Sequence, residues 1–183
     1  MLIMSRKITL LAFITLFYQP GCGEEKKASN SLVLFDAGAW ELEDATTDPS
    51  GHRPEEVICP QDAWFKENVS GEECLEVDTA ECHYLSVSQP LLHSFSAGDT
   101  LFLRLFHYPL IYPQNAEAHV AFYVDAQPLW ETTIPIPADA YFFHPEFTAP
   151  FTAEKGGRLN FHLHNHGNNT WNLFELSLKS ASD

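Results

Sequence analysis

The sequence predicts an all-β protein, a sandwich of two antiparallel sheets, and three observations point to this fold class. First, apolar and polar residues alternate in most of the patterned segments, with the period of two that a half-buried strand shows. Second, short clusters of Gly, Pro, Asn and Asp separate these segments. Third, no segment sustains a helical period, and 12 prolines argue against long helices. Many short strands of this kind form a β-sandwich or jelly roll.

The first 21 residues have the layout of an export signal. Arg6 and Lys7 precede an apolar run at 8–18, which is too short to span a bilayer as a helix because a span needs about 20 apolar residues. The junction Gly21-Cys22 resembles the processing site of bacterial lipoproteins. That resemblance implies that Cys22 is lipidated and becomes the mature N-terminus. The alternative is plain secretion, in which Cys22 has no such role.

The residues after Cys22 indicate where the mature chain resides. By resemblance to the sorting rules of Gram-negative bacteria, Gly23 at the next position favours the outer membrane over the inner membrane. Residues 22–30 form a polar tether, and 31–183 have the length of a single domain with a sizeable core. We therefore expect an exported protein that is anchored in the bacterial cell envelope by its lipid.

The mature chain is strongly acidic, which excludes some classes of partner. Removal of residues 1–21 leaves eight basic and 25 acidic residues, a formal net charge of −17. Such a surface repels nucleic-acid phosphates and anionic lipid headgroups. We expect no nucleic-acid partner, and contact with a membrane only through the N-terminal lipid.

Eight segments carry the strand pattern, namely 31–36, 74–78, 83–89, 100–107, 117–125, 128–136, 158–165 and 170–179. The first is the apolar run SLVLFD, and the next two, CLEVD and HYLSVSQ, alternate apolar with polar residues. The turns AGD (97–99) and YPQN (112–115) lead into TLFLRLFH and EAHVAFYVD. The turns DAQP (125–128), KGG (155–157) and GNN (167–169) lead into PLWETTIPI, RLNFHLHN and TWNLFELSLK.

The region 43–70 lacks this pattern. It is polar and contains Pro and Gly, so we expect a long loop there, with a short helical turn around residues 60–64. Three cysteines lie in or near this region: Cys59, Cys74 and Cys82. In an exported protein an odd number allows one internal disulfide among the three, and both Cys59–Cys82 and Cys74–Cys82 are possible. A zinc site made of these thiols is not expected, because no CxxC spacing is present.

The order of these elements resembles a known type of domain. The strand with Ser86-Val87-Ser88-Gln89 leads to SAGDTL (96–101), and an apolar strand, the segment VDAQPLW (124–130), an FTA segment (147–149), a GG turn and a last strand NLFELSL (172–178) follow. This arrangement is similar to the galactose-binding-like jelly rolls found among carbohydrate-binding modules. The resemblance implies two antiparallel sheets and a glycan ligand, held on a concave face or on rim loops.

Alternation assigns each strand residue to one of two faces, provided that the strand is regular, since one bulge would invert the assignment. Leu101, Leu103 and Leu105 share one face, and 118, 120, 122 and 124 point inward, as do 159, 161 and 163. In the last strand, 174, 176 and 178 are expected inside and 171, 173 and 175 outside. If these strands share a sheet, the outer face gathers a candidate ligand site: Arg104, His119, Tyr123, His162, His164, Trp171 and Glu175. Its aromatic and hydrogen-bonding groups suit a sugar, although the same face could pack against the 43–70 loop.

The stretch FHLHNHGNN (161–169) raises the question of a metal site. Residues two apart on a strand lie about 6.6 Å apart, so His162 and His164 could share a divalent ion, with a third ligand supplied by His119 or Glu175. Gly156 followed by five residues and then His162-Leu163-His164 also resembles the opening of the cupin metal motif. The glutamate that this motif needs next is absent, which argues against a cupin-like enzyme.

The sequence thus predicts a lipid-anchored binding module that takes carbohydrate and catalyses no reaction. No cofactor is expected apart from a possible divalent metal at His162 and His164. One alternative is a structural protein that binds another protein of the envelope. The other is a metal-dependent, cupin-like enzyme.

Overall fold

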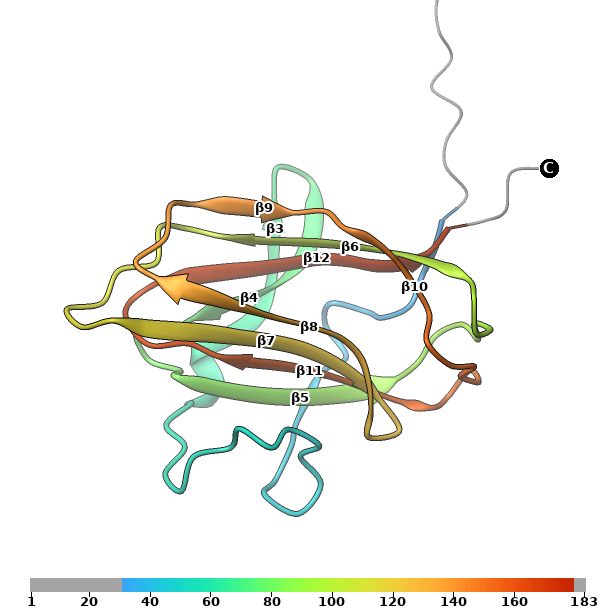
Figure 1. Ribbon diagram of the computed structural model, residues 1–183, viewed down its shortest axis with the longest axis horizontal. Coiled ribbons are helices and arrows are strands. Elements are labelled where there is room, and N and C mark those ends of the chain that lie inside the picture. The colour runs from blue at the N-terminus through green and yellow to red at the C-terminus, as the bar shows by residue number, and fades with distance from the viewer. Residues whose placement is uncertain (1–30, 180–183) are drawn as a thin grey trace, which may run out of the picture.

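In the computed structural model, which describes residues 31–179, two antiparallel sheets pack into a sandwich (Figure 1). The seven-stranded sheet has the order β10 (Glu146–Thr148), β6 (Thr100–His107), β12 (Thr170–Leu178), β4 (Glu72–Asp78) and β3 (Trp64–Val69), with β1 (Leu32–Val33) beside β12 and β9 (Tyr141–Phe143) beside β6. The five-stranded sheet has the order β2 (Glu41–Leu42), β5 (Tyr84–Pro90), β11 (Arg158–His164), β7 (Ala116–Val124) and β8 (Gln127–Ile136). The predicted all-β sandwich is confirmed, and the predicted helical turn is the 3-10 turn η1 (Gln61–Ala63).

The core lies between the two sheets and follows the predicted alternation in most strands. Leu101, Leu103 and Leu105 of β6 are fully buried, as are the inward residues 118, 120 and 122 of β7 and 159 and 161 of β11. Each large apolar side chain that leaves water in this way stabilises the fold by about 1.5–3 kcal/mol. Within residues 31–179, no helix reaches the length and apolar character that a membrane crossing would require.

The last strand differs from its predicted faces. The register between β12 and β6 shifts between Leu173 and Glu175, which marks a bulge. The extra residue moves Trp171 and Leu173 into the core, where both are at most 1% exposed, while Phe174 is only partly buried. The prediction that Trp171 lies on an outer face is therefore wrong, because a bulge inverts the alternation on one side of it.

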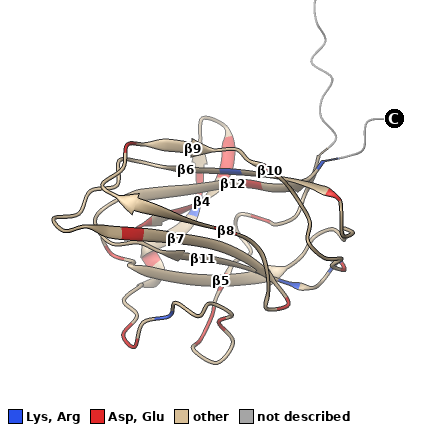
Figure 2. Ribbon diagram, in the orientation of Figure 1, with Lys and Arg blue, Asp and Glu red and all other residues tan. Residues whose placement is uncertain are grey.

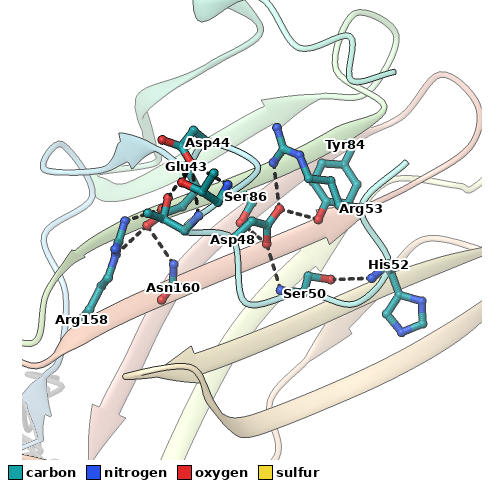
Figure 3. Close-up of polar contacts among 12 residues, drawn as sticks. Glu43, Asp44, Asp48, Ser50, His52, Arg53, Tyr84, Ser86, Arg158 and Asn160 are labelled. Carbon is teal, nitrogen blue, oxygen red and sulfur yellow. Dashed lines mark hydrogen bonds and ion pairs between the residues drawn. The ribbon is translucent and has the colours of Figure 1, made fainter. Parts of the chain in front are cut away.

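The predicted loop at 43–70 ends earlier than expected. Residues 64–69 form β3, an edge strand that pairs with β4 across the turn Ser70-Gly71, in which both residues have positive φ. β3 is mostly exposed, and its apolar residues lie at its two ends with Lys66, Glu67 and Asn68 between them, so it lacks the apolar alternation by which strands are found in a sequence. The remaining segment, residues 43–58, is called the strap here. It lies across the outer face of the five-stranded sheet (Figure 3).

The disulfide joins Cys59 to Cys82, one of the two predicted pairings, and Cys74 is a buried free thiol. The bridge attaches the end of the strap to the segment that enters β5. At its other end the strap continues from β2, which pairs with β5. Both ends of the strap are therefore held at the five-stranded sheet.

The two ends of the sandwich differ in what they carry. At one end β1 pairs with the C-terminal end of β12, at Leu178. At the other end, on the left in Figure 1, lie the 108–115 loop between β6 and β7 and the 165–169 turn between β11 and β12. Figure 2 shows that acidic residues occur on strands and loops throughout the described part, whereas basic residues are few.

Candidate functional site

The seven predicted ligand-site residues do not form one face. Arg104 and Glu175 lie on the outer face of the seven-stranded sheet, 3.6 Å apart at their charged atoms, and Arg104 also contacts Glu72 at 2.6 Å. Trp171 lies in the core. The other four, His119, Tyr123, His162 and His164, lie on β7 and β11 and point to the outer face of the five-stranded sheet. Alternation could not show that the strands bearing these residues belong to different sheets.

The strap covers much of that outer face through two carboxylates. Asp48 accepts hydrogen bonds from the hydroxyls of Tyr84 (2.6 Å) and Ser86 (3.0 Å) on β5, and from Arg53 (2.8 Å) and the Ser50 amide (2.9 Å) within the strap (Figure 3). Burial raises the pKa of Asp48, but these hydrogen bonds outweigh burial, so its pKa lies below the usual value. The carboxylate is therefore ionised at neutral pH and bridges the strap to β5.

The second carboxylate fastens the start of the strap. Glu43 is buried and accepts hydrogen bonds from the Arg158 side chain, at 2.8 Å from Nε, and from Asn160 Nδ2 at 3.0 Å (Figure 3). Burial raises the pKa of Glu43, but the hydrogen bonds from Ser88, Thr47 and Arg158 lower it by more. The net shift of its pKa is therefore downward. Together the two carboxylates accept hydrogen bonds from the polar groups that the sheet presents to the strap.

Beside the strap the histidines form a chain of ring contacts. His52 of the strap lies 4.3 Å from His119, measured between ring centres, and His119 lies 5.1 Å from His162. Tyr84 separates His162 from His164, with ring centres 4.9 and 5.4 Å away, and His164 continues to His166 at 4.9 Å. We call His52, His119, His162 and His164 the histidine cluster.

Two members of this cluster, His162 and His164, are uncharged at neutral pH. Burial, with a smaller contribution from His119, lowers the pKa of His162 to about 3. Burial and the neighbouring His166 lower the pKa of His164 to about 4. His162 is fully buried, and neither of its ring nitrogens has a hydrogen-bond partner among the protein atoms. These two imidazoles therefore act as neutral hydrogen-bonding and packing groups at pH 7.

The metal hypothesis finds no third ligand in the described residues. Glu175, one of its two candidates, lies on the opposite sheet. The other, His119, is a neighbour of His164 in the register of β7 and β11, but it does not complete a set of three ligands with His162 and His164. Across residues 31–179, no group of three His, Cys, Asp or Glu side chains is arranged to hold a metal ion. Metal binding by the pair His162 and His164 stays a prediction.

An open cleft lies at the rim, next to the cluster. Its volume is about 460 Å³, and it is lined by His52, Tyr112, Gln114, Asn115, Ala116, Glu117, His119, Thr133, His164 and His166. A second hollow of about 540 Å³ is lined by His83, Ile111, Tyr112, Pro113, His166, Gly167 and Asn168. Tyr112 and His166 belong to both, with ring centres 5.8 Å apart, and Tyr112 is 39% exposed. We call these two hollows the rim cleft.

The rim cleft exists because two connecting segments pack tightly. A Cβ on Gly167 would lie 2.2 Å from the carbonyl oxygen of Ile111, and Gly167 has a φ of 98°, so only glycine fits between the 165–169 turn and the 108–115 loop. Behind the turn, the buried Thr79 hydroxyl accepts hydrogen bonds from Asn165 Nδ2 (2.9 Å) and from the Asn169 amide (3.0 Å). These contacts hold the turn in place, and with it the position of His166.

Several residues of the rim cleft escaped the sequence prediction. The sequence pattern indicates only a turn at Gln114 and Asn115, and it does not single out His52. A signal was present in YPQN (112–115), since a tyrosine followed by two amide side chains in an exposed turn offers both an aromatic surface and hydrogen-bonding groups. Turn chemistry explains the proline and the asparagine of this stretch but not the amphipathic tyrosine.

Comparisons with known proteins find only distant structural similarity, at low sequence identity. No protein-family model matches the chain, and no curated protein matches it. Among solved structures, the chain is similar to one described as "CBM4 structure and function", at 15% identity over 66% of this chain and 96% of that one, with a TM-score of 0.42. It is also similar to the C-terminal CBM6 of LamC, a laminarinase from Zobellia galactanivorans (14% identity, 64% and 89% coverage, TM-score 0.42). A third is a non-crystalline-cellulose-specific carbohydrate-binding module, CBM28 (9% identity, 81% and 92% coverage, TM-score 0.44).

Proposed function

We propose that this chain is a lipid-anchored envelope protein that binds carbohydrate in the rim cleft and catalyses no reaction. One observation carries the proposal. An exposed tyrosine, Tyr112, lines two adjoining hollows, and the other walls of the first hollow are mainly hydrogen-bonding side chains.

The chemistry of the walls suits a sugar. The face of the Tyr112 ring can cover the C–H face of a pyranose, which removes apolar surface from water. Gln114 and Asn115 each present an amide that both donates and accepts hydrogen bonds. His164 is uncharged at pH 7, so its ring also offers one donor and one acceptor. Hydroxyl groups need such mixed partners, whereas an anion would need a cationic lining.

The size and accessibility of the rim cleft agree with this use. Each hollow falls in the range of about 300–1,000 Å³ that is usual for small-molecule sites. The resemblance seen in the sequence implies glycan binding either on a concave face or on rim loops. Because the strap covers the outer face of the five-stranded sheet, a ligand on this side of the sandwich can reach the rim but not that face.

The position of the chain entry bears on how an anchored domain would be oriented. Strand β1 pairs with Leu178 at one end of β12, whereas the rim turn precedes Thr170 at the other end. Eight residue steps along a strand correspond to about 27 Å. A lipid on Cys22, which lies outside the described residues, would attach to the end of the domain that is remote from the cleft. The cleft would then face away from the membrane.

The anchoring is tested separately from the binding. We expect radiolabelled palmitate to be incorporated into the wild-type protein and the protein to sediment with outer-membrane vesicles. A Cys22→Ser variant should lose both properties. If Cys22→Ser retained the label and the membrane fractionation, lipid attachment at Cys22 would be excluded while the glycan proposal would stand.

The binding proposal is tested on a glycan array with the purified protein. Tyr112→Ala should weaken the binding of the glycans found for the wild type by tenfold or more, about 1.4 kcal/mol, because the ring supplies the apolar contact. Tyr141→Ala is the matched control, since Tyr141 is exposed on β9, a strand of the opposite sheet, and should leave binding unchanged. Unaltered affinity in Tyr112→Ala, or no bound glycan on an array of hexose, uronate and amino-sugar oligomers, would contradict the proposal.

A second candidate is the binding of an envelope protein, and the outer face of the seven-stranded sheet favours it. The guanidinium of Arg104 lies 5.6 Å from the ring centre of Phe142 and 5.5 Å from that of Phe174, and Tyr108 and Tyr141 are more than half exposed. Phe142→Ser should abolish crosslinking to such a partner in cells and leave glycan binding intact. Crosslinking that persists in this variant would argue against this face.

A further inference from the structure

The rim cleft continues past Glu117 into a third hollow. This hollow has a volume of about 530 Å³ and is lined by Asn115, Ala116, Glu117, Pro135, Ile136 and Pro137. We call it the proline hollow. It shares its first three residues with the 460 Å³ hollow of the rim cleft, which in turn shares Tyr112 and His166 with the 540 Å³ hollow. The three hollows therefore adjoin in a row along the rim, with space for several linked sugars rather than for one.

The row has apolar ends and a polar centre. At one end Ile111, which is 67% exposed, lies beside Tyr112 and Pro113. At the other end Pro135 and Pro137 are exposed. The middle hollow is lined mainly by hydrogen-bonding side chains. A chain of pyranose rings combines apolar faces with polar edges in the same way, so it can bury ring faces at the ends while its hydroxyls bond at the centre.

The walls of the row carry a single carboxylate and no Lys or Arg. This carboxylate belongs to Glu117, which is exposed and lines both the middle hollow and the proline hollow. Within residues 31–179 its side chain forms no ion pair or hydrogen bond, whereas Arg53, Arg104 and Arg158 are each paired with a carboxylate outside these walls. A ligand can therefore engage Glu117 without breaking a contact of the fold.

The surroundings of Glu117 are acidic as well. Glu131 of β8, whose side chain is 60% exposed, lies 3.4 Å from His119, a wall residue of the middle hollow. The chain from Cys22 onward has a formal net charge of −17. A cleft lined by one sign of charge concentrates ligands of the opposite sign and repels those of its own sign. The row therefore favours a cationic ligand and disfavours sugars that carry carboxylate or sulfate groups.

A free amino group on a pyranose meets both properties of the row. When protonated, it donates charge-assisted hydrogen bonds to the carboxylate of Glu117. Near the ring of Tyr112 it also gains the attraction between a cation and an aromatic face. Acetylation of the amine removes the charge and with it both attractions. A carboxylate at the same position on the sugar would meet Glu117 with like charge, which selects against acidic glycans.

We propose that the rim cleft and the proline hollow bind oligomers of amino sugars whose amino groups are free, and that Glu117 selects these over N-acetylated, neutral and acidic glycans. The inference rests on the proposed function, because it names the class of glycan that the same cleft takes. The row of adjoining hollows accounts for the oligomer, and the carboxylate of Glu117 accounts for the preference for a cation.

The test is isothermal titration calorimetry of the purified protein at pH 6 and low salt, with three sugars. They are the β-1,4-linked tetramer of glucosamine, its fully N-acetylated counterpart and the glucosamine monomer. The two tetramers share ring, linkage and length and differ only in the acetyl groups. The wild type should bind the glucosamine tetramer at least threefold more tightly than the acetylated tetramer, and at least tenfold more tightly than the monomer.

Glu117→Gln connects this preference to the carboxylate. The substitution keeps the shape of the side chain and removes its charge, so the ratio of the two tetramer affinities should fall to about one. Glu154→Gln is the matched control, because Glu154 is exposed before the start of β11, whereas the rim turn follows the end of that strand. It removes the same charge far from the row and should keep the wild-type ratio.

The outcomes separate this inference from the proposed function. A wild-type ratio near one, or a ratio in Glu117→Gln as large as in the wild type, would overturn the selection by Glu117. If Tyr112→Ala still weakened glycan binding in either case, carbohydrate binding in the rim cleft would stand. A monomer bound as tightly as the tetramer would overturn the extended row. Binding of no glycan at all would overturn both proposals.

Discussion

The two outer faces of the sandwich differ in what covers them. On the five-stranded sheet the strap buries Tyr84, Asn160 and His162, which are polar or amphipathic and contact carboxylates of the strap or one another. On the seven-stranded sheet no segment of the described chain plays this part, and aromatic rings such as Phe142 alternate with the charged Arg104 and its acidic partners. Outward direction on a strand is thus not the same as exposure to water. The polar outer face is covered by a loop, whereas the mixed aromatic and charged outer face is exposed to solvent.

The largest effect expected from this contrast concerns Asp48. Asp48→Ala leaves the hydroxyls of Tyr84 and Ser86 and the guanidinium of Arg53 without their shared acceptor. Removal of one partner from a buried charged network costs about 3–5 kcal/mol, so we expect a loss of this order in the free energy of unfolding. Urea denaturation followed by tryptophan fluorescence measures it. A loss below about 1 kcal/mol would show that the strap contributes little to the stability of the closed face.

The matched change lies on the open face. Glu72→Ala removes a carboxylate that is 2.6 Å from Arg104 but more than half exposed. Ion pairs that are open to solvent contribute about 0–1 kcal/mol, so this variant should unfold close to the wild-type urea concentration. Equal losses in Glu72→Ala and Asp48→Ala would remove the energetic distinction between the two faces.

A smaller effect is expected from acid. The pKa of His162 lies near 3 in the folded state and at about 6.5 in the unfolded chain, so between these values the unfolded chain binds a proton that the closed fold excludes. Stability is therefore complete above pH 6.5 and falls as the pH decreases toward 3. At pH 5 the difference is about 2 kcal/mol for His162, since one pKa unit corresponds to about 1.4 kcal/mol.

The measurement compares urea midpoints at pH 7 and pH 5 in the wild type and in His162→Gln. The variant should keep about half of what the wild type loses, because His164, whose pKa is lowered to about 4, contributes a similar loss at pH 5. Replacement of the exposed His144 by Gln should leave the pH dependence as it is. A wild-type midpoint that does not change between the two pH values would mean that the covered face accepts the charge without cost.

The sequence alone determined the fold class and most of the core. Leu101, Leu103 and Leu105, and Phe161 and Leu163, are buried as their alternation predicts, because a strand offers only two faces and the apolar one leaves water. The number of cysteines likewise limited the prediction to one internal disulfide, with Cys59–Cys82 and Cys74–Cys82 as possible pairings. These are local properties, and a local pattern is enough to state them.

Tertiary structure decided what the outward residues contact. A bulge that no residue type announces placed Trp171 in the core, and the division of strands between two sheets separated Arg104 from His162. The strap, the histidine cluster and the rim cleft join residues more than 50 positions apart, such as His52 with His119 and Gly167 with Ile111. The physical reason is that alternation encodes only the direction of a side chain, whereas a site depends on which distant segment lies at the end of that direction.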